Sequence, residues 1–404
     1  MPRLLLVSNR LPVTVRAERG EVSVIRSAGG LATALRSPHE NLDSLWIGWP
    51  GDLSRLTPAQ RHSVETELAT LRAVPVHLSA AEVHRYYDGF SNGVLWPLFH
   101  YLVDKVNLDA RADWEAYRAV NERFADIVAA HYRPGDQIWI HDYQLMLLPE
   151  LLRQRLPDAK IGFFLHIPFP TADVFRILPW RDRLLRGLLG ADIVGFHTAL
   201  YGRHFVEAAA QVLGAETHGN TVLVDGRQVR VGTYPISIDV AAFEQLASDS
   251  RVQEEACSIR RKARGRKILL GIDRLDYTKG IPRRLLAIER FLEREPSLRG
   301  AVRFIQLAVP TREKVDAYAD FRRVVNELVG RINGHYGTLD SVPIHYLHRS
   351  MSVEQVAAMY VAADVMLVTP LRDGMNLVAK EYISSRVEND GVLVLSEFAG
   401  APRS

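Results

Sequence analysis

The chain has only one cysteine and no long apolar run. Among its 404 residues, Cys257 stands alone, so neither an internal disulfide nor a cysteine-rich zinc site can form. No segment reaches the roughly 18 apolar residues of a membrane-spanning helix. The N-terminal apolar run is broken by Ser8, Asn9 and Arg10 and is too short for a signal peptide. We therefore expect a soluble cytoplasmic protein, because a single cysteine fits a reducing compartment.

The chain also lacks a strong charge and the common ligand motifs. A net charge of +3 gives no reason to expect nucleic acid or a membrane as a partner. There is no GxGxxG dinucleotide fingerprint, no GxxxxGK[ST] phosphate loop, no HExxH and no Asp-x-Asp. We therefore expect no metal. A glycosidase pair of carboxylates stays open, although the predicted strand ends carry more cations than carboxylates.

What the chain does contain is two series of alternating strands and helices. Apolar runs typical of buried strands lie at 4–8, 137–141, 161–166, 192–197 and 229–235, and again at 267–272, 302–309, 343–348, 364–370 and 391–396. Helical patterns lie at 113–132, 200–214, 281–295, 313–333, 352–363 and 375–385. This alternation predicts an α/β protein of two Rossmann-like, doubly wound parallel-sheet domains, 1–239 and 240–404, facing a cleft.

Charged and imidazole side chains follow many of these strands. Ligands of such sheets bind beyond the carboxyl ends of the strands, so these residues predict a site between the domains. The alternative is a scatter of unrelated surface loops. The segments concerned are "VSNR" with Arg10, "HDYQ" with Asp142, "HIPFP" with His166, "DRLDYTKG" with Arg274 and Lys279, "PTRE" with Arg312 and "LRDGMN" with Asp373.

Each segment also has a structural interpretation. In "DRLDYTKG", Arg274 and Lys279 could converge on a diphosphate and stabilise its charge, or the turn could be solvated, with Arg274 paired to Asp276. In "LRDGMN", Asp373 could bind a ligand beside a helix starting at Met375, or simply cap that helix. The default for Arg372 is an ion pair.

Three further segments leave similar alternatives. "SAGGL" (27–31) could bring backbone N–H groups to an anion or be a plain turn. The aromatic "YYDGFSNGVLWPLFHY" (86–101) could form a wall against a sugar or a loop packed by its own rings. "RRKARGRK" (260–267) could touch nucleic acid, but a solvated helix end is expected.

When these segments are taken together, the chain resembles the retaining glycosyltransferases of the trehalose-6-phosphate synthase family. The resemblance rests on "VSNRLP", "SAGGL", "LWIGWPG", "YYDGFSNGVLWPLFHY", "IWIHDYQLMLLP", "GFFLHIPFP", "DRLDYTKG", "GRINGHYG" and "TPLRDGMNLVAKEY", in one order along nearly the whole chain. It implies a GT-B fold and transfer of glucose from a nucleotide diphosphate glucose, with UDP-glucose favoured, to glucose 6-phosphate. It also implies retained configuration, no metal or cofactor, and a front-face mechanism in which the leaving phosphate helps to deprotonate the acceptor.

The resemblance implies a role for each matching residue. Arg10 and Arg312 are expected at the acceptor phosphate, with Trp49, Tyr87, Trp96 and the hydroxyl-binding Asp142 also around the acceptor. On the donor side, the resemblance places Gly30 near the phosphates and Arg274 and Lys279 at the diphosphate. It places His166 at the glucose and Glu381 at the ribose. The glucose and phosphate are also expected to contact Asp373 and the backbone of Gly374, Met375, Asn376 and Leu377. Direct catalytic roles fall to Asp142, His166, Arg274, Lys279 and Asp373.

The sequence departs from the family in two places. The run "QLAVPTRE" before Arg312 differs from the usual pattern. Family members also continue beyond "SEFAGA" with further helices, so we expect this chain to be part of a longer protein. Alternatives are a sister transferase with another phosphorylated acceptor, such as glycerol 3-phosphate, and a silent sugar-phosphate-binding module. The donor base is not readable from the sequence, and a homo-oligomer is compatible with it.

Overall fold

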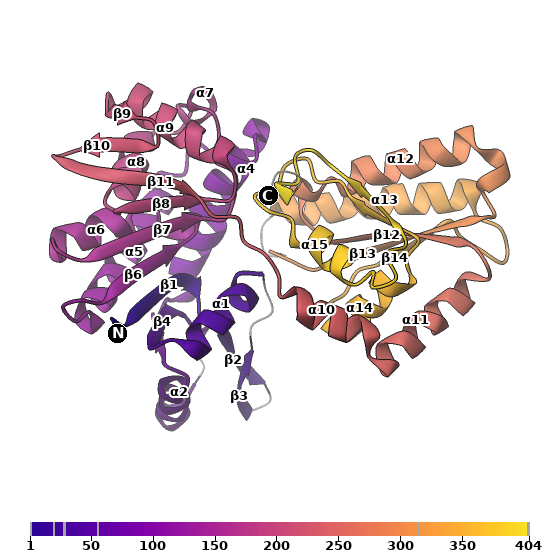
Figure 1. Ribbon diagram of the computed structural model, residues 1–404, viewed down its shortest axis with the longest axis horizontal. Helices are drawn as coiled ribbons and strands as arrows, with labels where there is room; N and C mark the ends of the chain where they lie inside the picture. Colours follow the sequence, from indigo (N-terminus) through magenta and orange to yellow (C-terminus); the bar gives the residue numbers. More distant parts are fainter. Residues whose placement is uncertain (1, 19–20, 27–29, 55, 313–315, 402–404) are drawn as a thin grey trace. The chain divides into compact units, whose positions relative to one another are not determined.

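The computed structural model describes residues 2–18, 21–26, 30–54, 56–312 and 316–401. By its internal contacts the chain divides into two compact units, Met1–Ile236 and Ser237–Ser404. Each unit contains a parallel sheet accompanied by helices (Figure 1), which confirms the predicted α/β class. None of the helices in the described ranges is long and apolar enough to cross a membrane.

The first unit is built on a sheet of nine strands within the described residues, in the order β5-β4-β1-β6-β7-β8-β11-β10-β9. Strands β5 to β11 in this order are parallel, and β10 and β9 add antiparallel pairings at one edge. The strands are β1 Leu4–Arg10, β4 Ser44–Trp49, β5 Ala73–Pro75, β6 Gln137–His141, β7 Lys160–Leu165, β8 Ile193–Phe196, β9 Glu216–His218, β10 Thr221–Val224 and β11 Arg227–Thr233.

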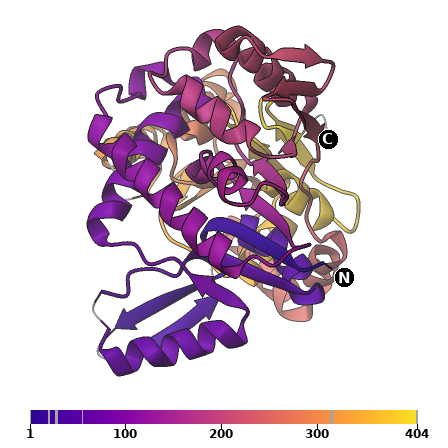
Figure 2. The same ribbon diagram turned by 90° about the vertical axis from the view of Figure 1, so that its left-hand side faces the viewer.

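Helices and one hairpin complete the first unit. The hairpin β2–β3 lies against α2, as Figure 2 shows. Its strands are β2 Val13–Glu18 and β3 Glu21–Arg26, and the helices are α1 Gly30–Asn41, α2 Pro58–Thr70, α3 Ala80–Glu82, α4 Trp96–Phe99, α5 Arg111–His131, α6 Leu148–Arg155, α7 Ala172–Phe175, α8 Arg181–Leu189 and α9 Ala199–Leu213. Short 3-10 helices lie at Val103–Lys105 and Tyr143–Leu145.

The second unit has a five-stranded parallel sheet within the described ranges, in the order β14-β13-β12-β15-β16. Its strands are β12 Lys267–Arg274, β13 Val302–Val309, β14 Ile344–Leu347, β15 Val365–Val368 and β16 Val392–Leu395. Its helices are α10 Val240–Ser248, α11 Ser250–Ala263, α12 Ile281–Arg294, α13 Asp316–Tyr336, α14 Val353–Ala362 and α15 Leu377–Ser384, with 3-10 turns at Tyr277–Lys279 and Pro296–Leu298.

The central strand of the second unit, β12, is buried on both faces. Along β12, Ile268, Leu270 and Ile272 join a core shared with α11 and α14, whereas Leu269 packs into a second core with α12 and α13. Successive side chains of a strand point to opposite faces, so a continuous apolar run serves both cores. The doubly wound arrangement predicted from those runs is therefore present.

Some local structure differs from the sequence-based expectation. The strand β4 and the β2–β3 hairpin were not among the predicted strands. Helix α15 begins at Leu377 rather than at Met375, and its N-cap is Asn376, whose side chain accepts a hydrogen bond from the N–H of Ala379 at 3.2 Å. Asp373 is therefore not the cap of this helix. The basic run 260–267 does end α11 before β12, as predicted.

The aromatic segment is helical, which the irregular sequence pattern did not predict. Residues Val83–Leu95 form a π-helix that continues directly into α4. Ser91 Oγ donates to the carbonyl of Tyr86 and Asn92 Nδ2 to that of Tyr87, each at 2.8 Å and five residues apart. These bonds match the i→i+5 pitch. Helices of this type are rare and frequently occur at functional sites.

Candidate active site

In the first unit, the predicted residues gather at one edge of the sheet. Strand β1 pairs with β4 on one side and β6 on the other, so the strand order reverses at β1. Ligands of doubly wound sheets bind beyond the carboxyl ends at such a reversal. Trp49 ends β4, Arg10 ends β1, Asp142 follows β6 and His166 follows β7. The sheet therefore brings these four residues to neighbouring strand ends.

Arg10 is held by aromatic rings. Its guanidinium carbon lies 4.6 Å from the ring centre of Trp49 and 5.7 Å from that of Tyr87, distances at which a cation is attracted to a π face. No ion pair to Arg10 occurs among the described residues. Trp49 Nε1 is buried and has no hydrogen-bond partner within the described ranges. A positive charge and an unsatisfied donor therefore stand side by side, which suits an anionic, hydroxylated ligand.

A close approach of two strands fixes this corner. A Cβ on Gly48 would lie 2.8 Å from both the carbonyl carbon of Arg10 and the oxygen of Ser8. Ser8 Oγ donates to the Arg10 carbonyl at 2.7 Å and accepts from Trp46 Nε1 at 2.8 Å. Glycine in "LWIGWPG" thus lets the end of β4 lie against the end of β1, which positions Arg10.

The π-helix adds to the same edge of the sheet. It carries Tyr87, and the buried Trp96 follows it in α4. Trp96 packs against Tyr143 with ring centres 5.6 Å apart, and the Tyr143 hydroxyl donates to Asn92 Oδ1 at 2.9 Å. Because Tyr143 directly follows Asp142, the aromatic segment is fastened to the loop after β6.

Asp142 has a strained backbone. Its φ of 77° and ψ of 169° lie in a region that is essentially reserved for glycine. Its N–H donates to the carbonyl of Phe164 at 2.8 Å, and its Oδ1 accepts from the N–H of His166 at 3.2 Å. Residues held in this way cost about 1–3 kcal/mol and cluster at functional sites. This observation supports the predicted ligand-binding role of Asp142.

His166 belongs to a row of three histidines. His141, His166 and His197 stand at or just beyond the ends of the adjacent strands β6, β7 and β8. His141 Nδ1 lies 3.1 Å from His166 Nε2, and the ring centres of His166 and His197 are 5.3 Å apart. Burial lowers the pKa of His141 to about 3 and that of His166 well below its usual range, where His141 and His197 add to the effect. His141 and His197 were not predicted.

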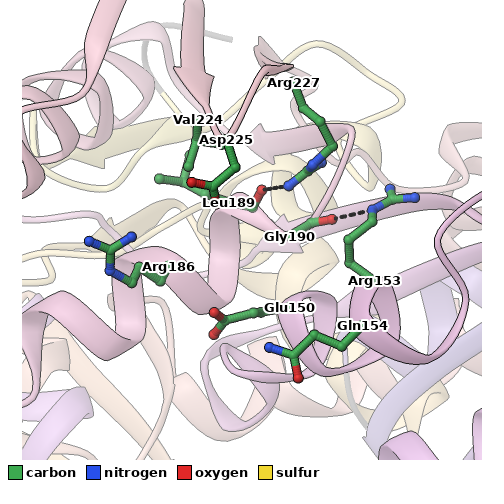
Figure 3. Close-up of a pocket in the computed structure, with 9 residues that line it drawn as sticks. All are labelled: Glu150, Arg153, Gln154, Arg186, Leu189, Gly190, Val224, Asp225 and Arg227. Atoms are coloured by element: carbon green, nitrogen blue, oxygen red, sulfur yellow. Dashed lines mark hydrogen bonds between the residues drawn. The ribbon is translucent and has the colours of Figure 1, made fainter.

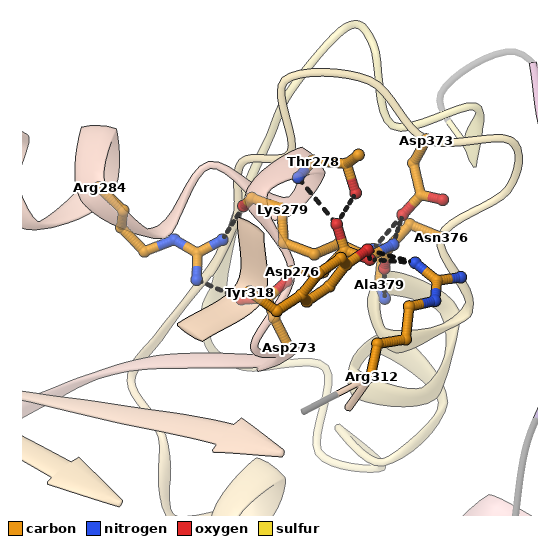
Figure 4. A network of polar contacts seen from close by, with 10 residues as sticks. All are labelled: Asp273, Asp276, Thr278, Lys279, Arg284, Arg312, Tyr318, Asp373, Asn376 and Ala379. Atoms are coloured by element: carbon orange, nitrogen blue, oxygen red, sulfur yellow. Dashed lines mark hydrogen bonds and ion pairs between the residues drawn. The ribbon is translucent and has the colours of Figure 1, made fainter. Parts of the chain in front are cut away.

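In the second unit, the reversal of strand order lies at β12, between β13 and β15. A polar network fills the loops that follow these strands (Figure 4). At its centre is the fully buried Asp276, which pairs with Arg312 at 2.9 Å and accepts bonds from Tyr318 and Thr278. Burial alone would raise the pKa of Asp276, but the charges of Arg312, Arg274 and Lys279 outweigh it and hold the pKa at about 2.

A second ion pair joins the two loops. Lys279 Nζ lies 2.5 Å from Asp373 Oδ2, and Asn376 Nδ2 donates to the same oxygen at 3.1 Å. Lys279 and Asp373 are 9% and 8% exposed, so little water competes with the pair. Gly280 allows this approach, because it has a φ of +69° and a Cβ there would lie 2.4 Å from the carbonyl oxygen of Thr369. The loops "DRLDYTKG" and "TPLRDGMN" are therefore brought together.

A third pair supports the network from below. Arg284 of α12 is buried and bonds to Asp273, to Gln306 at 2.9 Å and to Thr369 at 2.9 Å. Arg284 was not among the predicted residues. Its only signal was an arginine on the otherwise apolar face of α12, where charged residues are rarely buried unless paired.

The remaining predicted residues lie around this network. Gly374, Met375 and Asn376 are buried just before α15, and Leu377 opens it. Glu381 Oε2 accepts from the hydroxyl of Tyr360 at 2.7 Å, and burial raises the pKa of Glu381.

One expectation needs correction, and two others are tested only in part. Asp276 forms its ion pair with Arg312 of its own unit, not with Arg274. The guanidinium carbon of Arg372 lies 5.2 Å from the ring centre of Phe398, and the ion pair expected for Arg372 stays a prediction. Gly30 is exposed and begins α1, but the rest of "SAGG", at 27–29, falls outside the described residues.

A surface pocket of the first unit lies away from the predicted residues (Figure 3). It is found near the amino ends of β8 and β11, because Gly190 lies shortly before β8 and Arg227 begins β11. Its arginines stand near Glu150 and Asp225, and Arg153 pairs with Asp192 at 2.7 Å. Its charges are thus largely balanced. Among the described residues, no group of His, Cys, Asp and Glu is arranged to hold a metal ion.

These features define a two-unit α/β protein whose strand ends collect cations, carboxylates and histidines. The chain belongs to glycosyltransferase family 20, whose model matches residues 2–404. It is 46% identical, over all 404 residues, to alpha,alpha-trehalose-phosphate synthase (UDP-forming) A of Dictyostelium discoideum. The match covers 54% of that protein, so the chain spans about half the length of this relative.

Two solved structures are also similar. One is the alpha,alpha-trehalose-phosphate synthase (UDP-forming) of Burkholderia xenovorans in complex with glucose-6-phosphate, with a TM-score of 0.85 and 37% identity over 99% of this chain and 86% of that one. The other is the N-terminal domain of trehalose-6-phosphate phosphatase from Candida albicans, with a TM-score of 0.89 and 34% identity over 99% and 83%. These similarities confirm the resemblance read from the motifs.

Proposed function

We propose that this protein transfers glucose from a nucleotide diphosphate glucose, with UDP-glucose favoured, to glucose 6-phosphate and releases trehalose 6-phosphate. Membership of family 20 and the UDP-forming name of the Dictyostelium relative support this proposal. The observation that carries it is the corner formed by Arg10 and Trp49, a cation without an ion-pair partner among the described residues beside a buried, unsatisfied N–H. A sugar phosphate offers both groups what they lack.

The first unit would bind the acceptor. The phosphate of glucose 6-phosphate would meet Arg10, with Tyr87 and Trp96 beside the sugar and Asp142 accepting from its hydroxyls. Arg312 is proposed at the same phosphate from the family resemblance. Because its guanidinium already bonds Asp276 and Tyr318, Arg312 would share its remaining N–H groups or exchange partners on binding.

The second unit would bind the donor. Arg274 and Lys279 would hold the diphosphate, and the free N–H groups at the start of α15 favour an anion there. Asp373 and the backbone of residues 374–377 would hold glucose and phosphate, with His166 at the glucose and Glu381 at the ribose. Tyr360 occupies one oxygen of Glu381 and leaves the other available.

The proposed chemistry needs no protein nucleophile. The bond from glucose to the diphosphate breaks, and the leaving phosphate oxygen takes the proton of the attacking hydroxyl on the same face of the sugar. The protein would hold the acceptor hydroxyl and the leaving diphosphate together on one face of the sugar. It would also stabilise the charge that develops on the diphosphate, each hydrogen-bond donor contributing on the order of 3 kcal/mol by analogy with oxyanion sites. Independence from metals and cofactors stays part of the proposal.

The test is to incubate the protein with UDP-glucose and glucose 6-phosphate and to measure UDP release. Trehalose 6-phosphate should form at the same rate, and EDTA should not lower it. An absence of turnover with UDP-, GDP- and ADP-glucose alike would refute the proposal. An assay with glycerol 3-phosphate in place of glucose 6-phosphate distinguishes the proposed enzyme from a sister transferase, which would turn over with glycerol 3-phosphate.

The second candidate function is that of a sugar-phosphate-binding module without catalytic activity. It is favoured by the likeness to the Candida albicans domain, which belongs to a protein named as a phosphatase. Binding of glucose 6-phosphate by calorimetry, without turnover for any donor, would support this candidate. A cytoplasmic location and a homo-oligomer stay predictions.

A further inference from the structure

The contact between His141 and His166 raises a question of proton placement. Their facing nitrogens, His141 Nδ1 and His166 Nε2, lie 3.1 Å apart, so one must donate and the other accept. Because burial keeps both imidazoles neutral near pH 7, each ring carries a single N–H. The position of one proton therefore fixes the position of the other.

The far nitrogen of His141 decides between the two arrangements. His141 is 1% exposed, and its Nε2 is buried without a hydrogen-bond partner among the described residues. If Nε2 carried the proton, an N–H would be buried unsatisfied, which is rare in folded proteins. If the proton is on Nδ1, only a lone pair is left unsatisfied, and the N–H is used toward His166.

His166 then has its own proton placed for it. With Nε2 accepting from His141, a neutral His166 carries its N–H on Nδ1. Within the described part of the chain no hydrogen bond engages this nitrogen, and the residue is only partly buried. The N–H on Nδ1 of His166 is therefore the ring group that can donate a hydrogen bond to a ligand.

We propose that His141 is a positioning residue that donates to His166 Nε2 and so makes His166 a hydrogen-bond donor, through Nδ1–H, to its ligand. The ligand is an oxygen of the donor sugar, an identification that rests on the proposed function. The assignment of the tautomers does not rest on that function: it stands on the 3.1 Å contact, the buried Nε2 of His141 and the neutral state of both rings. A histidine fixed in this way rejects a ligand group that offers only an N–H or O–H in that direction, and selects one that offers a lone pair.

Two substitutions distinguish the hydrogen bond that His141 donates from the volume that its side chain fills. In His141→Asn the amide nitrogen takes the place of Nδ1, and in His141→Gln it takes the place of Nε2. His131→Asn is the control, because His131 Nδ1 contacts the carbonyl of Ile127 at 2.8 Å, away from the three histidines. The first readout is the tautomer of His166 from two-bond ¹H–¹⁵N correlations of the histidine-labelled, ligand-free protein at pH 7.5.

We expect His166 to be protonated on Nδ1 in the wild type, in His141→Asn and in the control, and to lose this preference in His141→Gln. A wild-type spectrum with the proton on Nε2 would overturn the assignment, even if His141→Gln failed to fold. This readout does not depend on turnover, so it remains decisive if the proposed function is wrong.

The second readout is kinetic. Loss of a group that orients a metal ligand typically costs about ten- to hundredfold. By analogy, His141→Gln should lower kcat/KM for the donor by about tenfold or more, while KM for glucose 6-phosphate changes less than about twofold. His141→Asn should recover most of the loss. An equal loss in both variants, or a matching rise in the acceptor KM, would assign His141 a merely structural role.

Discussion

The two units handle charge in opposite ways at their strand ends. In the first unit, Arg10 lies over the rings of Trp49 and Tyr87 and has no ion pair among the described residues, although Asp142 follows the neighbouring strand β6. In the second unit, Lys279, Arg284 and Arg312 each pair with a carboxylate in a buried network. The first unit therefore presents a cation whose charge no described carboxylate pairs with, whereas the cations of the second unit already have counter-ions, which the proposed donor would have to displace or share.

This difference suggests how each substrate would be selected. An unpaired arginine on aromatic faces suits a compact phosphate monoester, because nothing has to move before it binds. The paired loops of the second unit are rigid beforehand and align α15 for a ligand. Binding of the donor would then redistribute hydrogen bonds at Asp373 rather than create a site.

The largest effect is expected for Lys279→Ala. Loss of the Lys279 ammonium group removes a proposed contact with the diphosphate, so kcat should fall by about 10²–10³-fold. It also leaves Asp373 buried and unpaired, which should lower the free energy of unfolding by about 3–5 kcal/mol. Urea unfolding and steady-state assays measure the two effects. Lys267→Ala is the matched control, because its pair with Asp364 is exposed and is expected to matter by less than about 1 kcal/mol.

Combining Lys279→Ala with Asp373→Asn sharpens this test. The double variant removes the buried charge and should recover much of the stability but none of the turnover. If stability were unchanged in the single variant, the pair would not be the buried counter-ion that distinguishes the second unit.

Arg10→Ala should have the next largest effect. Without the free cation, KM for glucose 6-phosphate should rise by about a hundredfold, in line with about 1.5–3 kcal/mol for a charge-assisted bond. KM for the donor should stay within twofold, and stability should hardly change, because no buried partner is left behind. A rise in the donor KM instead would remove the proposed division of labour between the units.

The pH dependence of stability should show two windows. The unfolded pKa of histidine is about 6.5 and the folded pKa of His141 is about 3. Between these values the unfolded chain binds the proton, so stability falls by about 1.4 kcal/mol per pH unit as pH decreases. Asp276, with its pKa held at about 2, contributes in the same direction only below about pH 4.

Urea unfolding from pH 7.5 to 3 would measure both windows. His141→Asn should reduce the slope between pH 6.5 and 4.5 by about 1.4 kcal/mol per pH unit. Part of the slope should remain, because the pKa of His166 is lowered as well. Asp276→Asn should change the slope only below pH 4. Identical profiles in wild type and His141→Asn would show that His141 is not kept neutral by the fold.

The smallest expected effect concerns the strain at Asp142. Replacement by glycine should change the free energy of unfolding by less than about 1 kcal/mol, because relief of the strain at a φ of 77° offsets loss of the bond that Oδ1 accepts from the N–H of His166. Turnover should nevertheless fall, since a proposed hydroxyl acceptor is lost. Asp225→Gly, at a φ of 49° beside the remote pocket, is the control and should leave turnover unchanged. Thermal unfolding and assays provide both readouts.

The location of many candidate site residues could be predicted, because the apolar runs in the sequence show where the strands end. Apolar runs located β1, β6 and β7, and the residues after them, Asp142 and His166 among them, followed directly. Their individual roles came from the family resemblance, not from the pattern. The pairing of Lys279 with Asp373, 94 residues apart, and of Arg312 with Asp276 depends on tertiary contacts that no local pattern encodes. The cap at Asn376 was missed because Asp373 and Asn376 are both suitable residues.

The π-helix of Val83–Leu95 has a consequence for insertions and deletions. Each residue of an ordinary α-helix turns the chain by about 100°. Removing one residue between Tyr87 and Trp96 would rotate everything after the deletion, relative to Tyr87, by an angle of about this size. Trp96 would then leave Tyr143, and Asn92 its bond to the Tyr143 hydroxyl. The spacing of this segment, more than the identity of any one residue in it, is therefore what a functional relative has to keep.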